Sequence, residues 1–319
     1  MLETLTEIRR LLAGAQRVLI VSHVSPDGDT LGAALGLAWA LRRKGFAVRL
    51  ACADPTPPEL RFLPGSEGFA VQPVGDAQLI FCIDASDTAR LGSVYDAPSF
   101  DAVTVINIDH HVTNTQYGDV NLVTPRSSTA EIILEIIPPL GLALDETVAT
   151  CLLAGLVSDT RGFRTSNTTT ASLQAASALV EAGASLFEVS EAVFNHRTLS
   201  AMRLWGAVLA RAQLEDGLLW AELPLALANA YGGDPLASKG LINLLSECAE
   251  AHVTVLFREM EDGAGVDVGF RSKPGYDVSS VALALGGGGH PQAAGCQVAG
   301  TLDQVRAQVL AALRALAKA

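Results

Sequence analysis

The chain has 319 residues, of which 49% are hydrophobic and 18% are charged, so it is long and apolar enough to form two folded domains. Acidic residues outnumber basic ones by 34 to 22, and the net charge of −12 argues against a protein that holds long nucleic acids by their phosphates. The five scattered cysteines include no C-x-x-C pair, which indicates buried thiols in a reducing compartment. No signal-peptide pattern is present, and the longest apolar run, residues 31–41, is too short to cross a bilayer. We therefore expect a soluble cytoplasmic protein.

The first half of the chain alternates strand and helix patterns. Short β-branched or apolar runs predict strands at residues 17–22, 46–51, 79–83 and 103–108. Helical patterns cover residues 30–44, 128–137, 146–157 and 168–181. This alternation predicts an α/β fold with a doubly wound, mainly parallel sheet, in which ligands bind beyond the carboxyl ends of the strands.

The pattern changes near residue 205. Residues 186–203 remain helical but become more polar, which is typical of a linker between domains. Residues 207–214 and 218–223 then predict a hairpin, and residues 253–257 and 266–270 predict two strands that flank an acidic turn at 261–263. A helix over 278–285 precedes four consecutive glycines. We expect a first domain over residues 1–186, a helical linker over 187–205 and a smaller α+β domain over 206–319.

Four clusters of carboxylates and histidines stand out, and three of them follow predicted strands. Their side chains are His23, Asp27 and Asp29, then Asp84, then Asp109, His110 and His111, and finally Asp159. Carboxylate and imidazole ligands without a thiolate favour Mn²⁺ or Mg²⁺, with Fe, Co or Zn also compatible. Two such cations, about 3.5–4 Å apart, would activate a water for attack on phosphorus. The sequence therefore predicts a metal-dependent enzyme.

Each cluster taken alone has a simpler explanation. Asp27-Gly28-Asp29 is also a common surface turn, Asp84 could cap a short helix, and Asp159 could cap a turn. The metal interpretation is preferred because most of the clusters end predicted strands, which is where sheets of this kind bind ligands.

The C-terminal part offers groups suited to a phosphate. The glycines before His290 would let backbone N–H groups approach an anion, although a tetraglycine can also be a flexible linker. Arg271 and Arg164 could each pair with a phosphate or be solvated surface arginines.

Taken in order, these motifs resemble those of the DHH phosphoesterase superfamily, and most closely its NrnA-like nano-RNase subgroup. The four catalytic motifs are matched by Ser22-His23 with Asp27-Gly28-Asp29, by Asp84, by Asp109-His110-His111 and by Ser158-Asp159-Thr160. The associated C-terminal domain is matched by Arg271-Ser272, by residues 286–290 and by Ala293-Ala294-Gly295. The resemblance implies that the first domain is the catalytic, metal-binding one and the second the substrate-binding one.

The resemblance also implies a role for each site residue. One cation would be held by His23, Asp27 and Asp84, and a second by Asp29, Asp84, His110 and Asp159, with Asp84 bridging. The catalytic pair would be Asp109, which orients a ligating histidine, and His111, which contacts the scissile phosphate. Substrate would be bound by Arg271, Ser272, Gly288, Gly289 and His290, with Arg164 as a further candidate.

The implied activity is that of a two-metal phosphodiesterase that uses Mn²⁺, or else Mg²⁺ or Co²⁺, to hydrolyse short oligonucleotides to mononucleotides. Dephosphorylation of 3′-phosphoadenosine 5′-phosphate is a second implied activity. The partners would be short single-stranded RNA or DNA or small nucleotides, without a membrane, and a homodimer is left open. The alternatives are a cyclic- or linear-dinucleotide phosphodiesterase, a RecJ-type exonuclease for single-stranded DNA, and a non-enzymatic nucleotide-binding protein. The last is disfavoured because no ligand of the set is missing.

Overall fold

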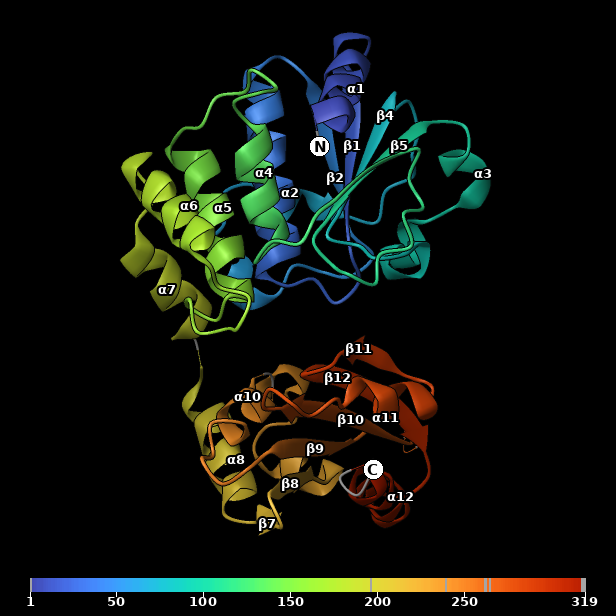
Figure 1. The fold of residues 1–319 in the computed structure, drawn as a ribbon, viewed down its shortest axis with the longest axis vertical. Helices are drawn as coiled ribbons and strands as arrows, with labels where there is room; N and C mark the ends of the chain where they lie inside the picture. Colours follow the sequence, from blue (N-terminus) through green and yellow to red (C-terminus); the bar gives the residue numbers. More distant parts are fainter. Residues whose placement is uncertain (1, 196, 239, 261–262, 264, 317–319) are drawn as a thin grey trace. The chain divides into compact units, whose positions relative to one another are not determined.

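The computed structural model describes residues 2–195, 197–238, 240–260, 263 and 265–316 (Figure 1). The chain forms two compact units, residues 1–196 and residues 197–319. Within the described residues, each unit is built on one six-stranded sheet.

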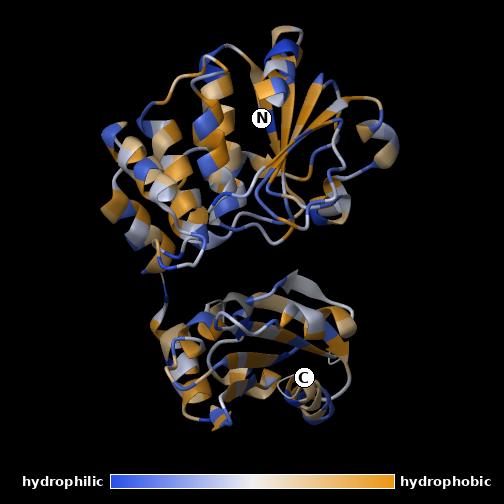
Figure 2. Cartoon of the chain, in the orientation of Figure 1, coloured by the Kyte–Doolittle hydropathy of each residue, from blue (hydrophilic) through white to orange (hydrophobic). Residues whose placement is uncertain are grey.

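The sheet of the first unit is parallel throughout, with the strand order β3-β2-β1-β4-β5-β6. Its strands are β1 (Arg17–Ser22), β2 (Ala47–Ala51), β3 (Phe69–Ala70), β4 (Leu79–Ile83), β5 (Thr104–Asp109) and β6 (Val120–Val123). In β1, Val18 and Ile20 face one hydrophobic core and Leu19 and Val21 face another, so both faces of the sheet are buried. Burial on both faces explains the continuous apolar runs, visible as hydrophobic strands in Figure 2. The predicted α/β fold is confirmed.

Helices cover both faces of this sheet. The core on one face is lined by α1 (Leu2–Ala13), α2 (Gly28–Arg43), α4 (Thr129–Ile136) and α5 (Glu146–Asp159), with α6 (Thr170–Glu181) and α7 (Leu186–Phe194) packed on α5. The opposite face is covered by the 3₁₀ helix η3 (Thr88–Val94) and the short helix α3 (Ala97–Phe100). The other 3₁₀ turns described in this unit are η1 (Pro58–Leu60) and η2 (Ser66–Gly68).

Close packing of α2 against α5 brings two of the predicted clusters together. A Cβ on Gly32 would lie only 2.4 Å from the carbonyl oxygen of Cys151, so the small residue lets the two backbones approach. A Cβ on Gly28 would lie 2.5 Å from the Cβ of Ser158. The start of α2 therefore lies against the end of α5, where Asp159 is the last residue.

The second unit contains a mixed sheet with the order β11-β12-β10-β9-β8-β7, in which β8 and β9 are parallel and the other pairs antiparallel. Its strands are β7 (Gln213–Glu215), β8 (Leu218–Leu223), β9 (Val253–Glu259), β10 (Gly265–Ser272), β11 (Gly288–His290) and β12 (Ala293–Ala299). Its helices are α8 (Leu199–Leu209), α9 (Leu225–Ala230), η4 (Pro235–Ser238), α10 (Leu241–Leu245), α11 (Ser279–Ala284) and α12 (Leu302–Leu316). The expected α+β character of this unit is confirmed.

Some expected boundaries differ from the structure. Residues 207–209 end helix α8 instead of starting a hairpin strand, because Leu204 and Val208 are buried on one helical face. Asp84 caps no helix; Asp87 accepts the backbone N–H of Arg90 at the start of η3. Most of the acidic turn predicted at 261–263 lies outside the described residues.

Among the described residues, none of the helices combines the length and the apolar character that a membrane crossing requires.

Candidate metal centre

Three neighbouring strands, β1, β4 and β5, end at one edge of the sheet and carry the predicted ligands. His23 follows β1, Asp84 follows β4, and Asp109 is the last residue of β5. All three side chains are buried, with at most 2% of each residue exposed. Their meeting at this edge is the arrangement expected for a parallel sheet.

Asp84 lies at the centre of the site. Its Oδ2 is 3.5 Å from Nε2 of His23, and its Oδ1 is 3.6 Å from Nε2 of His110. Oδ1 also accepts a hydrogen bond of 2.8 Å from the hydroxyl of Thr129. The backbone of Asp84 has a φ of +60°, a left-handed conformation that is uncommon outside glycine and recurs at functional sites.

The structure brings the six proposed metal ligands together as two sets. The first set is His23, Asp27 and Asp84, and the second is Asp29, His110 and Asp159; within each set the potential ligand atoms lie within 4.8 Å of one another. A third group of such atoms joins Asp84 to Asp109, His110 and His111. Oxygen and imidazole donors in two adjoining sets fit a pair of divalent cations of the Mn²⁺ or Mg²⁺ type.

Backbone carbonyls orient the two histidines of these sets. Nδ1 of His23 lies 2.7 Å from the carbonyl oxygen of Val24, and Nδ1 of His110 lies 3.2 Å from that of Arg126. A carbonyl oxygen can only accept, so in this arrangement each Nδ1 donates its proton. Each Nε2 is then left with the lone pair that a metal ion requires.

Helix N-termini hold two of the carboxylates. Asp27 caps α2, and its Oδ1 accepts from the backbone N–H groups of Asp29 and Thr30. Both oxygens of Asp29 accept from the first turn of α4, at 2.6 Å from the nitrogen of Thr129 and 2.9 Å from that of Ala130. The positive ends of the two helices favour these negative charges.

Asp109 is fully buried beside His111 and is held from both sides. Its Oδ1 accepts from the backbone N–H groups of His110 and His111 and lies 2.7 Å from Nδ1 of His111. Its Oδ2 accepts from the amide of Asn114 at 2.5 Å, and the same amide donates to Oδ1 of Asn107 at 2.8 Å. This network fixes the ring of His111 with a proton on Nδ1.

The carboxylates repel one another when no cation is bound. Burial, followed by the charges of Asp84 and Asp159, raises the pKa of Asp29 well above its ordinary value. Burial also raises the pKa of Asp159 to about 7, with Asp27 and Asp84 adding to the effect. Burial acts to raise the pKa of Asp84. The pKa is nevertheless lowered overall, because His23 and His110 face its two oxygens. Two divalent cations would relieve this repulsion, which is why the residues fit such a pair.

The pKa of His111 is raised. Burial acts to lower it, but the hydrogen bond to Asp109 and the charges of Asp84 and Asp159 outweigh burial and raise the pKa to about 9. Without bound cations, His111 therefore carries a positive charge at neutral pH.

Most of the predicted substrate residues lie on two strands of the second unit. Arg271 on β10 and His290 on β11 are both paired with Ala293 of the intervening strand β12, so they lie level with each other across that strand. Gly288 and Gly289 belong to the regular strand β11 and not to an irregular loop, and Ser272 ends β10 and donates to the carbonyl oxygen of Tyr276. Arg164, in the first unit, follows α5 in a turn where Arg161 and Phe163 have positive φ.

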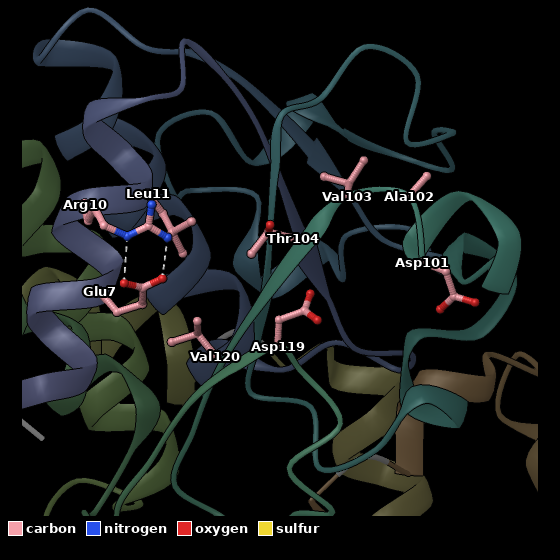
Figure 3. Close-up of a pocket in the computed structure, with 9 residues that line it drawn as sticks. All are labelled: Glu7, Arg10, Leu11, Asp101, Ala102, Val103, Thr104, Asp119 and Val120. Carbon is pink, nitrogen blue, oxygen red and sulfur yellow. Dashed lines mark hydrogen bonds and ion pairs between the residues drawn. The ribbon is translucent and has the colours of Figure 1, made fainter.

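A pocket of about 380 Å³ lies away from these residues, at the amino-terminal ends of β5 and β6 (Figure 3). It is lined by Glu7 and Arg10, which form an ion pair, together with Leu11, Asp101, Ala102, Val103, Thr104, Asp119 and Val120. None of the predicted site residues lines it.

The sequence reasoning missed two residues that contact the site. Asn114 contacts Asp109 from the turn after β5, and Thr129 contacts Asp84 from the start of α4. Each had a local signal: Asn114 lies three residues after His111, and the Ser-x-x-Glu pattern from Ser128 marks a helix start directly before Thr129.

Comparison with known proteins identifies the family. A model described as the DHH family, N-terminal domain, matches residues 17–156, and one described as the DHHA1 domain matches residues 222–319. The bifunctional oligoribonuclease and PAP phosphatase NrnA of Thermus thermophilus is 35% identical over 303 residues, which cover 93% of this chain and 89% of that protein. This chain belongs to the DHH family. The resemblance seen in the sequence is thereby confirmed.

A second relative agrees with this assignment, and a solved structure shares the fold. The protein of the same name from Bacillus subtilis is 28% identical over 92% of this chain and 93% of its own length. A crystal structure of an exopolyphosphatase-related protein from Bacteroides fragilis superposes with a TM-score of 0.93 at 24% identity, covering 100% of this chain and 98% of that one, which shows a shared fold. As a member of this family, the chain is a phosphoesterase. DHH phosphoesterases are metal-dependent, and the histidine and carboxylate sets of this chain could hold metal ions.

Proposed function

We propose that this DHH-family member is a two-metal phosphodiesterase that uses Mn²⁺ to hydrolyse short oligonucleotides to mononucleotides and that also dephosphorylates 3′-phosphoadenosine 5′-phosphate. The observation that carries the proposal is the placement of Asp84, whose two oxygens face His23 of one ligand set and His110 of the other. The names of the two relatives that match along nearly their whole length support the substrate class.

The cation pair, when bound, lowers the pKa of a water and polarises the phosphate that the water attacks. One cation would be held by His23, Asp27 and Asp84, and the other by Asp29, His110 and Asp159 together with Asp84, whose Oδ1 lies 3.6 Å from Nε2 of His110. Mn²⁺ is proposed over softer metals because the donors are carboxylate oxygens and imidazole nitrogens without a thiolate.

His111 is proposed to contact the scissile phosphate. Asp109 holds Nδ1 of His111, so Nε2 can donate a hydrogen bond to a phosphate oxygen or a proton to the leaving oxygen. Asp109 acts through His111 and is a positioning residue in this scheme. Its own position depends on Asn114.

The second unit is proposed to bind the nucleotide through Arg271, Ser272, Gly288, Gly289 and His290, and Arg164 is proposed to contribute from the first unit. A guanidinium forms charge-assisted hydrogen bonds with phosphate, and their loss costs about 1.5–3 kcal/mol. Arg271→Ala should therefore raise KM for nucleotides about ten- to a hundred-fold, whereas hydrolysis of bis-p-nitrophenyl phosphate should change less. Arg314→Ala, which removes an exposed arginine from the same unit, is the control. Equal losses on both substrates would contradict this role of the second unit.

A substrate panel tests the proposed activity. The purified protein with Mn²⁺ would be incubated with RNA and DNA of 2 to about 24 nucleotides, structured 50-mers, cyclic dinucleotides, pyrophosphate and 3′-phosphoadenosine 5′-phosphate. We expect dinucleotides to be cleaved faster per molecule than long strands, because a chain of net charge −12 offers little attraction to an extended phosphate backbone. Preference for cyclic dinucleotides, or equal turnover of dinucleotides and structured 50-mers, would refute the proposed substrate.

Asp84→Ala tests the two-metal site. This change removes the carboxylate that is proposed to serve both cations, so we expect loss of both cations and of activity on every substrate. Asp101→Ala, which removes an exposed carboxylate at the other end of the sheet, should leave both unchanged. Full activity of Asp84→Ala, or of the wild type in excess EDTA, would overturn the mechanism.

The domain limits 1–186, 187–205 and 206–319, a cytoplasmic location and a homodimer remain predictions.

A further inference from the structure

Arg90 is half-buried and lies next to the loop that follows β1 and carries His23. Within the described part of the chain, the guanidinium of Arg90 forms neither a hydrogen bond nor an ion pair. Other partly buried arginines are paired: Arg126 with Glu135 and Arg306 with Glu222. A cation removed in part from water is costly unless an anion approaches it, so the position of Arg90 is suited to a ligand of opposite charge.

The backbone of Arg90 is fixed against the loop that carries His23. Its carbonyl oxygen accepts a hydrogen bond of 2.7 Å from the backbone N–H of Val24, and its own N–H donates to Asp87 at 3.1 Å. Two residues later, Gly92 has a φ of +57°, and a Cβ there would lie 2.4 Å from Cγ1 of Val24. The chain around Arg90 is therefore held one hydrogen bond away from a residue that adjoins a metal ligand.

The charge of Arg90 reaches the site. The pKa of His23 is raised overall: burial, the largest influence, and the charge of Arg90 act to lower it, but the hydrogen bond to Asp84 and the charges of Asp27 and Asp84 outweigh them. The ligand sets contain four carboxylates, from Asp27, Asp29, Asp84 and Asp159, which balance the charge of two divalent cations. Because these charges balance, a nearby guanidinium would add a net favourable charge for a negatively charged phosphate and strengthen its binding.

We propose that Arg90 is a phosphate-binding residue of the catalytic unit, whose guanidinium donates to a non-bridging phosphate oxygen of a nucleotide at the metal centre. The inference deepens the proposed function and rests on it for the identity of the substrate. The phosphate is either the scissile one or a terminal one next to it, and both present the same oxygen acceptors.

Arg90→Gln and Arg90→Lys test the assignment. The matched control is Arg61→Gln, because Arg61 also has no side-chain partner among the described residues but is exposed. The Mn²⁺-loaded proteins would be titrated with inorganic phosphate in a calorimeter, and KM would be measured for a dinucleotide with a 5′-phosphate and for one with a 5′-hydroxyl. We expect Arg90→Gln to weaken phosphate binding and to raise KM about ten- to a hundred-fold, with a smaller effect for Arg90→Lys and unchanged Mn²⁺ content.

The two dinucleotides separate the two phosphates. An equal rise in KM for both assigns Arg90 to the scissile phosphate, and a rise confined to the 5′-phosphorylated one assigns it to the terminal phosphate. The proposal would be overturned if Arg90→Gln had the same phosphate affinity and the same KM as Arg61→Gln. Loss of Mn²⁺ from Arg90→Gln would overturn it as well. If the wild type hydrolyses no nucleotide, the proposed function fails, whereas the phosphate titration still decides the role of Arg90.

Discussion

Removing the divalent cations should make the protein less stable as the pH rises from about 4.5 to 7. Chelation with EDTA leaves Asp159 close to Asp27 and Asp84 with no positive ion between them. Burial and these two charges raise the pKa of Asp159 to about 7 in the folded protein, against an ordinary value of 3.8. Asp29, whose pKa is raised for the same reasons, acts in the same direction.

The sign follows from proton linkage. A carboxyl group whose pKa is higher in the folded state binds its proton more tightly there, so its contribution to stability is largest below 3.8 and falls as the pH rises towards 7. The difference of about three in pKa corresponds to ~4 kcal/mol. The side chain of Asp159 is 30% exposed, and screening by solvent reduces this figure to ~2 kcal/mol. In a unit of this size, such a change lowers Tm by roughly 4–8 °C.

Thermal unfolding followed by circular dichroism measures the effect at pH 4.5, 5.5 and 7.0, with EDTA and with Mn²⁺. The pH range of this experiment lies above the ordinary pKa of Asp84. It also lies largely below the range in which His111, whose pKa is raised to about 9, loses its contribution to the stability of the folded state. We expect Tm to fall with pH in EDTA and to be level or to rise in Mn²⁺, since metal binding requires deprotonated ligands. Asp159→Asn should lose a large part of the fall. An identical fall in Asp159→Asn, or a rise in Tm with pH in the EDTA-treated wild type, would refute the reasoning.

Two further changes probe the surroundings of the centre. Asn114→Ala removes the amide that holds Asp109, so kcat should fall about ten-fold or more while KM and Mn²⁺ content stay near the wild-type values; loss of Mn²⁺ in this variant would show a structural role instead. Gly155→Ala would place a Cβ 2.9 Å from Oδ1 of Asp29, so we expect a loss of about 1–3 kcal/mol in unfolding free energy and weaker Mn²⁺ binding by calorimetry. The control Gly206→Ala, in an exposed stretch of helix where a Cβ would meet nothing within 4 Å, should leave stability equal or higher.

The sequence by itself determined the class of fold and the positions from which the site is built. Apolar runs such as residues 79–83 must be buried on both faces, which requires a parallel sheet covered by helices. Chain direction alone then places His23, Asp84 and Asp109 at the same edge, because parallel strands end together. Local composition also predicted a second domain starting near residue 205, but it misplaced residues 207–209, whose apolar pattern suits a strand or a buried helix equally well.

Only the tertiary structure decided how the candidate ligands are arranged around Asp84. Asp84 faces both His23 and His110 because its backbone adopts a positive φ and because β4 lies between β1 and β5, and neither fact can be read from a single aspartate. The hydrogen bonds from α4 to Asp29 join positions 100 and 101 residues apart. Sequence patterns report periodicity over about one or two turns. The contacts described here depend instead on how closely α2, α4 and α5 approach one another, and small residues such as Gly32 and Gly155 set that distance.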